Sequence, residues 1–273
     1  MTGRSLGARF PGAGVPPATP RSHGALRIVA LHGVPTSPAL WSRVPLDIVA
    51  PALGGVATVA DRADWSLASF VDEVVPLLDA DTVLIGHDLG GVVAAMAALR
   101  VRVRRLVLTG TALGPYWGPV RLTARAPLHH YFYDRYGGRR FLTGGVAPSR
   151  SEEVLVAFPP VPDVGARMRA LARQMRPPPG LARAVAARVP VSLVWGRDDR
   201  WYPPWVARAV ARGAGASITW VEGGHLCMWE EPDAYARGLR AVLDTPVDVS
   251  EVSDVSHVPD VSVTGSHGTG ADR

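Results

Sequence analysis

The feature that most constrains the fold is the run Gly86-His87-Asp88-Leu89-Gly90-Gly91, which stands between an apolar stretch at 82–85 and an Ala- and Val-rich helical pattern at 89–99. Glycines two positions before and after Asp88 indicate a tight strand-to-helix turn, because the backbone there passes close to its neighbours. A buried apolar strand that leads directly into a helix is typical of a parallel α/β sheet. At such a turn the central side chain projects above the carboxyl edge of the sheet, where open α/β folds bind ligands.

Short apolar runs alternate with helical patterns over most of the chain. We predict strands at 26–31, 56–60, 82–85, 105–108, 191–195 and 217–221. We predict helices that begin near Ser66, Leu89, Pro203 and Pro232. Such alternation implies right-handed βαβ units and a mostly parallel sheet.

The stretch 113–188 interrupts this alternation. It is rich in Arg, Tyr, Gly and Pro and holds two helix-like pieces, at 121–136 and 164–175. We therefore expect a core formed by residues 25–112 and 189–243, with an inserted subdomain at 113–188.

The two ends of the chain differ in composition from the middle. Residues 1–24 are rich in Pro, Gly and Arg without periodicity, and residues 244–273 carry six acidic side chains and no large apolar one. Segments so poor in apolar surface cannot offset the entropy lost on ordering. We predict that both are disordered tails.

Charge and cysteine content exclude several classes of protein. The chain has a net charge of +5 and no lysine, and its arginines are scattered rather than gathered into the stripe that nucleic-acid binding requires. A single cysteine, Cys227, excludes an intrachain disulfide framework and a Cys-based metal site. No apolar run is long enough for a membrane span, and residues 1–24 lack the apolar region of a secretory signal. We expect a cytoplasmic monomer or homodimer that acts on a small molecule without a cofactor or metal, and that binds neither nucleic acid nor membrane.

Three further motifs follow predicted strands. They are His32-Gly33-Val34-Pro35, the segment 195–203 (WGRDDRWYP), and Gly223-Gly224-His225. Because parallel strands end at the same edge of a sheet, these motifs are expected to meet Asp88 there. The chain order nucleophile, acid, base is that of the α/β-hydrolase triad.

In these four motifs the chain resembles α/β-hydrolase fold proteins of the Asp-nucleophile branch, which includes epoxide hydrolases and haloalkane or haloacid dehalogenases. The resemblance covers residues 25–243 and implies a mostly parallel sheet flanked by helices, with a helical cap inserted after the sixth strand of the family's numbering. Residues 1–24 are too rich in Pro and Gly for the antiparallel hairpin that normally opens this fold. We therefore expect a sheet of about six strands without that hairpin.

The resemblance also implies roles for individual residues. Asp88 matches the nucleophile, Asp199 the acid and His225 the base, with Asp198 as the alternative position of the acid. The backbone N–H groups of Val34 and Leu89 match the oxyanion hole.

An aspartate in the nucleophile position changes the expected chemistry. A carboxylate is already ionised at neutral pH, since its reference pKa is about 3.9, and it can displace a leaving group from an sp³ carbon. The product is an alkyl ester on Asp88, which water activated by His225 and Asp199 then hydrolyses. Attack by Asp88 on an acyl carbon would instead give an anhydride, so ordinary ester hydrolysis is disfavoured.

The leaving group distinguishes the candidate activities. An epoxide oxygen needs a proton donor, and Tyr131 and Tyr133 lie in a stretch that looks similar to the tyrosine-bearing cap helix of epoxide hydrolases, although no tyrosine lies between 137 and 201 for the second donor. Dehalogenases hold the halide with a Trp after the nucleophile and a polar residue after His-Gly, positions that are Leu89 and Val34 here. The sequence therefore favours an epoxide hydrolase acting on a small or medium hydrophobic epoxide. A dehalogenase with the same triad and a repurposed non-hydrolytic member, ligand-binding or cyclase-like and in secondary metabolism, are the alternatives.

Overall fold

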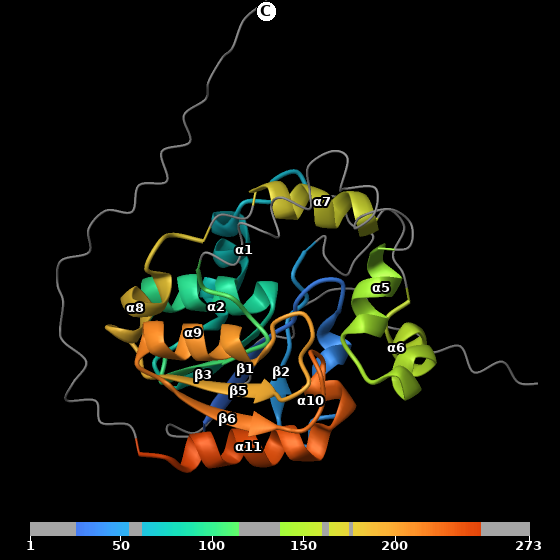
Figure 1. The fold of residues 1–273 in the computed structure, drawn as a ribbon. Coiled ribbons are helices and arrows are strands. Elements are labelled where there is room, and N and C mark those ends of the chain that lie inside the picture. Colours follow the sequence, from blue (N-terminus) through green and yellow to red (C-terminus); the bar gives the residue numbers. More distant parts are fainter. Residues whose placement is uncertain (1–25, 55–61, 115–136, 160–163, 175–176, 247–273) are drawn as a thin grey trace, which may run out of the picture.

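The computed structural model of the protein describes residues 26–54, 62–114, 137–159, 164–174 and 177–246 (Figure 1). In this part of the chain six strands form one sheet in the order β2-β1-β3-β4-β5-β6, and every neighbouring pair is parallel. The strands are β1 (Arg27–Leu31), β2 (Ile48–Val49), β3 (Thr82–His87), β4 (Arg105–Thr109), β5 (Val191–Gly196) and β6 (Ser217–Val221). The predicted mostly parallel sheet is confirmed.

Helices cover both faces of the sheet, as Figure 1 shows. One face packs against α1 (Leu67–Val74), α2 (Leu89–Arg100), α8 (Leu181–Ala186) and α9 (Pro204–Ala214). The other face packs against the 3₁₀ helix η1 (Pro38–Trp41), α10 (Cys227–Glu230) and α11 (Pro232–Asp244). Alternate residues of β1 supply the two cores, since Val29 and Leu31 point to the first and Ile28 and Ala30 to the second.

Local sequence signals place most of these elements correctly. The Ser66 side chain accepts a hydrogen bond from the Ser69 N–H and caps α1, and Pro204 and Pro232 occupy the first turns of α9 and α11. The predicted strand at 56–60 lies outside the described residues. Strand β2 was not predicted, because Ile48 and Val49 belong to an apolar run of only three residues, which Pro51 ends.

Four described helices lie between β4 and β5, namely α5 (Gly137–Gly144), α6 (Ser151–Ala157), α7 (Val164–Gln174) and α8. Two short 3₁₀ helices, η2 (Val75–Leu77) and η3 (Pro148–Arg150), complete the set. In Figure 1 the arrowheads of β5 and β6 point toward the side of the molecule where α5 and α6 lie. Helix α7 coincides with the predicted piece at 164–175, whereas the piece at 121–136, with Tyr131 and Tyr133, lies outside the described residues.

The parallel register brings four loops to one edge of the sheet. Strands β1, β3, β5 and β6 end directly before His32, Asp88, Arg197 and Glu222. The four sequence motifs therefore converge at the carboxyl ends of the strands, where the candidate site lies.

Candidate active site

Asp88 occupies a sharp turn between β3 and α2. Its backbone has φ 50° and ψ −118°, and it is the one non-glycine residue with positive φ in the part of the chain that the structure describes. Such a conformation costs about 1–3 kcal/mol and persists only where its surroundings impose it. Here the Asp88 N–H donates to the Gly110 carbonyl at 3.1 Å and its own carbonyl accepts from the Thr111 hydroxyl at 2.7 Å.

Two glycines make room for this turn. A Cβ added to Gly86 would lie 2.5 Å from the Gly91 Cα, so strand and helix cross too closely for any side chain. A Cβ added to Gly33 would lie 2.4 Å from the Cβ of Asp88. The glycine of the His-Gly motif is therefore required by contact with the Asp88 side chain itself.

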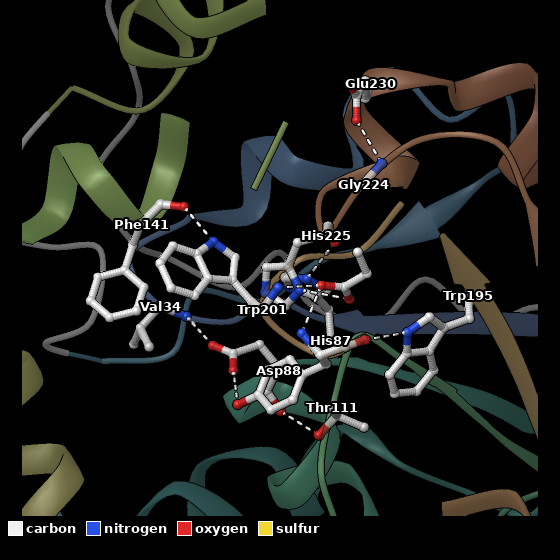
Figure 2. Close-up of polar contacts among 12 residues, drawn as sticks. Val34, His87, Asp88, Thr111, Phe141, Trp195, Trp201, Gly224, His225 and Glu230 are labelled. Atoms are coloured by element: carbon white, nitrogen blue, oxygen red, sulfur yellow. Dashed lines mark hydrogen bonds and ion pairs between the residues drawn. The ribbon is translucent and has the colours of Figure 1, made fainter. Parts of the chain in front are cut away.

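The two oxygens of the Asp88 carboxylate have different hydrogen-bond donors. Oδ2 accepts from the Val34 N–H at 3.0 Å, and Oδ1 accepts from the Tyr202 hydroxyl at 3.0 Å (Figure 2). Burial raises the pKa of Asp88 above its ordinary value. The charge of His225 and the amides of Val34 and Leu89 act in the opposite direction and favour the carboxylate.

His225 lies beside the acid loop. Its Nδ1 is 3.0 Å from Asp199 Oδ2, and both side chains are buried. Burial alone disfavours the protonated ring, but the pKa of His225 is nevertheless raised because the charges of Asp199 and Asp88 outweigh that effect. Asp198 is exposed, so the structure brings Asp199 rather than its neighbour to the histidine.

Two carboxylates hold the loops that carry these residues. Asp199 Oδ1 accepts from the backbone N–H groups of Trp201 at 2.9 Å and Tyr202 at 2.8 Å. Glu230 is buried and accepts from the N–H groups of Gly224 at 2.8 Å and Ala147 at 2.7 Å, so it links the loop of His225 to the segment that follows α5 (Figure 2).

The other two buried histidines serve the backbone. His32 has both ring nitrogens engaged, with the Gly33 carbonyl at 2.9 Å and the Leu53 N–H at 3.0 Å, and burial lowers its pKa to about 4. His87 Nε2 lies 3.0 Å from the His225 carbonyl oxygen and donates to it, and burial lowers its pKa well below the usual range. Both rings are neutral supports at pH 7.

The structure thus brings together Asp88, Asp199, His225 and the amide of Val34, with the amide of Leu89 at the start of α2. Tyr131 and Tyr133 lie outside the described residues. Sequence reasoning missed Tyr202 and Glu230. Tyr202 could have been suspected because it stands three residues after Asp199 in a loop that faces the site, whereas nothing in the sequence pointed to Glu230.

Among the described residues, no group of three or more His, Cys, Asp or Glu side chains could hold a metal ion. None of the helices in those same ranges is long and apolar enough to cross a bilayer.

A parallel sheet covered on both faces, with an acidic side chain at the strand-to-helix turn and an Asp–His pair on the next loops, defines an α/β-hydrolase fold. The comparison of sequences agrees, since a model of the alpha/beta hydrolase family matches residues 28–238. The chain belongs to the alpha/beta hydrolase family. A sequence search of curated proteins finds no match.

Solved structures show the same fold at low sequence identity. A haloalkane dehalogenase from Bradyrhizobium elkani USDA94 is 20% identical over 81% of this chain and 91% of its own, with a TM-score of 0.62. An enol-lactonase from Burkholderia xenovorans LB400 is 18% identical over 82% and 94%, with a TM-score of 0.62. A thermophilic esterase from Thermogutta terrifontis is 20% identical over 80% and 89%, with a TM-score of 0.59.

Proposed function

We propose that the protein is a hydrolase that forms a covalent alkyl ester on Asp88 and hydrolyses it, with a small or medium hydrophobic epoxide as its substrate. The observation that carries this proposal is the hydrogen bond from the Val34 N–H to Asp88 Oδ2. In a serine hydrolase the oxyanion-hole amides receive an oxygen of the substrate. Here the amide is directed at an oxygen of the nucleophile itself, which is the oxygen that becomes negative when water attacks an Asp88 ester.

The second half of the reaction falls to His225. Held by Asp199 at Nδ1, its ring directs the other nitrogen, Nε2, to water as a general base. Water then attacks Cγ of Asp88, and the negative charge gathers on Oδ2 against the Val34 and Leu89 amides. Removing one oxyanion-hole donor from a serine protease costs about 10²–10³-fold in kcat, and we expect a loss of that order here.

An epoxide is favoured over a halide by the side chains next to Asp88. Leu89 is fully buried and aliphatic, and Val34 is aliphatic too, so neither side chain donates a hydrogen bond to a departing halide. The indole N–H of Trp201, on the loop beside Asp199, is not directed at a halide either, because it donates to the Phe141 carbonyl at 3.0 Å.

The test is to trap the ester. His225→Gln should accumulate a covalent adduct on Asp88 when incubated with a panel of epoxides, read by intact mass and peptide mapping. Asp88→Asn/His225→Gln is the matched control and should give none. Adducts from chloro- or bromoalkanes alone would make the protein a dehalogenase. Absence of any adduct from an active wild-type protein would exclude covalent catalysis by Asp88.

A single turnover of the wild type in H₂¹⁸O provides an independent check. The proposed route places the label in the carboxylate of Asp88, because water attacks Cγ and not the substrate carbon. Label in the product alone would contradict the ester intermediate.

A further inference from the structure

The Tyr202 hydroxyl is the one side-chain group that the structure describes as donating a hydrogen bond to the Asp88 carboxylate. It lies 3.0 Å from Oδ1, and the two residues are 114 positions apart in the chain. The Tyr202 side chain belongs to the core and is only 6% exposed. It therefore reaches the nucleophile from within the sheet domain, on the loop that also carries Asp199.

Its position is held from both sides. The Tyr202 N–H donates to Asp199 Oδ1 at 2.8 Å, and its carbonyl accepts from the Trp195 indole N–H at 3.0 Å. The ring also lies against His225, with 5.4 Å between ring centroids. Such anchoring keeps the hydroxyl at one place relative to Asp88 and spares the entropy of ordering it during the reaction.

The two carboxylate oxygens are thereby given different tasks. Oδ2 faces the Val34 amide, where charge develops when the ester is hydrolysed. Oδ1 is then the oxygen that attacks the substrate, and it is the oxygen that Tyr202 contacts.

We propose that Tyr202 is a catalytic acid that protonates the oxygen leaving the carbon attacked by Asp88 Oδ1, and that it thereby selects substrates with an oxygen leaving group. This inference rests on the proposed ester mechanism. The Tyr202 hydroxyl can reach both oxygens. At the start of attack, Asp88 Oδ1 lies about 3–3.5 Å from the carbon, and the leaving oxygen lies one C–O bond beyond that carbon. Two hydrogen bonds from the Tyr202 oxygen, of about 3 Å each, together span more than this separation.

The first step balances as follows. A lone pair of Asp88 Oδ1 forms a bond to an epoxide carbon, and the ring C–O bond breaks. The released electron pair on the epoxide oxygen takes the Tyr202 proton, which leaves a phenolate. The hydroxyl turns from Oδ1 to the leaving oxygen because the negative charge moves the same way.

The second step restores Tyr202 through the same contact. His225 takes one proton from water as its oxygen attacks Cγ, and it returns that proton to the departing Oδ1 as the Cγ–Oδ1 bond breaks. The new oxygen on Cγ brings the second proton of water, so Asp88 is left as a carboxylic acid. That proton passes to the Tyr202 phenolate, and the sum is epoxide plus water to diol.

The experiment measures alkylation alone, in the His225→Gln protein, with propylene oxide and trifluoropropylene oxide as probes. The two differ in the basicity of the leaving alkoxide, which the fluorines lower. Adding Tyr202→Phe should slow the adduct with propylene oxide by about 10²–10⁴-fold, the usual worth of a general acid. The loss with the trifluoro compound should be several-fold smaller, because a less basic leaving oxygen depends less on a donor.

The matched control is Tyr235→Phe, which removes a hydroxyl from a second buried tyrosine. Tyr235 packs against Trp41 on the opposite side of the sheet from Tyr202. It should leave both rates unchanged. An equal loss of alkylation rate with both epoxides in Tyr202→Phe would overturn the acid role and mean that Tyr202 only positions Asp88. No loss of rate would overturn any role of Tyr202 in the reaction. If His225→Gln itself forms no adduct with either epoxide or any haloalkane, the ester mechanism is what fails.

Folding of the variant is checked by circular dichroism. Should Tyr202→Phe unfold, replacing Tyr202 with 3-fluorotyrosine keeps the size and the hydroxyl but makes the phenol more acidic. An acid role predicts a changed ratio of the two alkylation rates, and an unchanged ratio would overturn it.

Discussion

At the carboxyl ends of the strands, Asp88, Asp199 and His225 are buried, and His225 contacts Asp199, whereas at the amino ends Arg105 is buried against backbone carbonyls. Arg105 begins β4, and its guanidinium donates to the carbonyls of Val242 and Thr245 at the end of α11. A cation at that place satisfies carbonyls that a helix C-terminus leaves without partners and complements its dipole. Charged groups are buried at both edges, but at the carboxyl edge they are compensated by ionisable side chains and backbone amides, and at the amino edge by backbone carbonyls.

The difference teaches which edge can do chemistry. Arg105 keeps its charge against backbone carbonyls, which exchange no proton, so we expect its contacts to contribute to stability rather than to chemistry. At the carboxyl edge His225 is a base that can take up and return a proton beside Asp88, with burial and charge shifting the pKa of both groups. Substitutions at the two edges should therefore separate activity from stability.

The largest effect should come from Asp88→Asn. An amide cannot displace an epoxide oxygen, so we expect turnover to fall by about 10⁴-fold or more, as when a nucleophile is removed from other hydrolases. Steady-state kinetics with the most reactive epoxide of the panel measures this. Full activity in the variant would place the chemistry elsewhere.

The same variant should change how stability depends on pH. Because burial raises the pKa of Asp88 in the folded protein, the stability that Asp88 contributes is present at low pH and is lost as pH rises through that pKa. Asp88→Asn lacks this loss. Urea unfolding of both proteins between acidic and neutral pH should show the wild type losing more stability.

Next in size is the effect of Asp199→Asn. An amide at this position favours the wrong tautomer of His225, and a comparable change in a serine protease lowers kcat by about 10⁴-fold. Single-turnover decay of the Asp88 ester should show the loss. Asp198→Asn is the matched control, since its side chain is exposed, and equal losses in both variants would mean that the acid has been wrongly assigned.

Arg105→Met should have the opposite effect to the substitutions at the carboxyl edge, lowering stability while leaving activity unchanged. Hydrogen bonds to a charged group contribute about 1.5–3 kcal/mol, so unfolding by urea should show a stability loss of that order. The kcat of the folded fraction should be unchanged, because Arg105 lies at the amino edge. A fall in kcat without loss of stability would break the comparison of the two edges.

The smallest effect concerns the pKa of His225. The charge of Asp88 is one of the causes that raise it, so Asp88→Asn should lower the pKa of His225. Titration of the ring resonances by NMR, assigned with His225→Gln, measures the shift. Since the ester is uncharged like the amide, the same change would favour the neutral base when water must be activated. An unchanged pKa would show that Asp88 does not act on the base.

The sequence was most informative where structure depends on neighbouring residues. The glycines around Asp88 specify a turn of a few residues, and each strand of the sheet except β2 shows its own apolar run or lies in one. The choice between Asp198 and Asp199 followed from a resemblance, and the contact of Asp199 with His225 agrees with it. Strand β2 was missed because its pairing with β1 is supplied by the sheet and not by its two residues.

By itself, therefore, the sequence determined the parallel α/β fold and the turn at Asp88, because these follow from periodicity, glycine spacing and strand ends. The three candidate catalytic residues came from the family resemblance of the motifs at those strand ends. Only the tertiary structure decided that Tyr202 contacts Asp88 Oδ1, that the Val34 amide is directed at Oδ2, and that Glu230 joins two distant loops. Such contacts join residues 54, 83 and 114 positions apart. Their formation depends on how several strands register in one sheet, which no local pattern encodes.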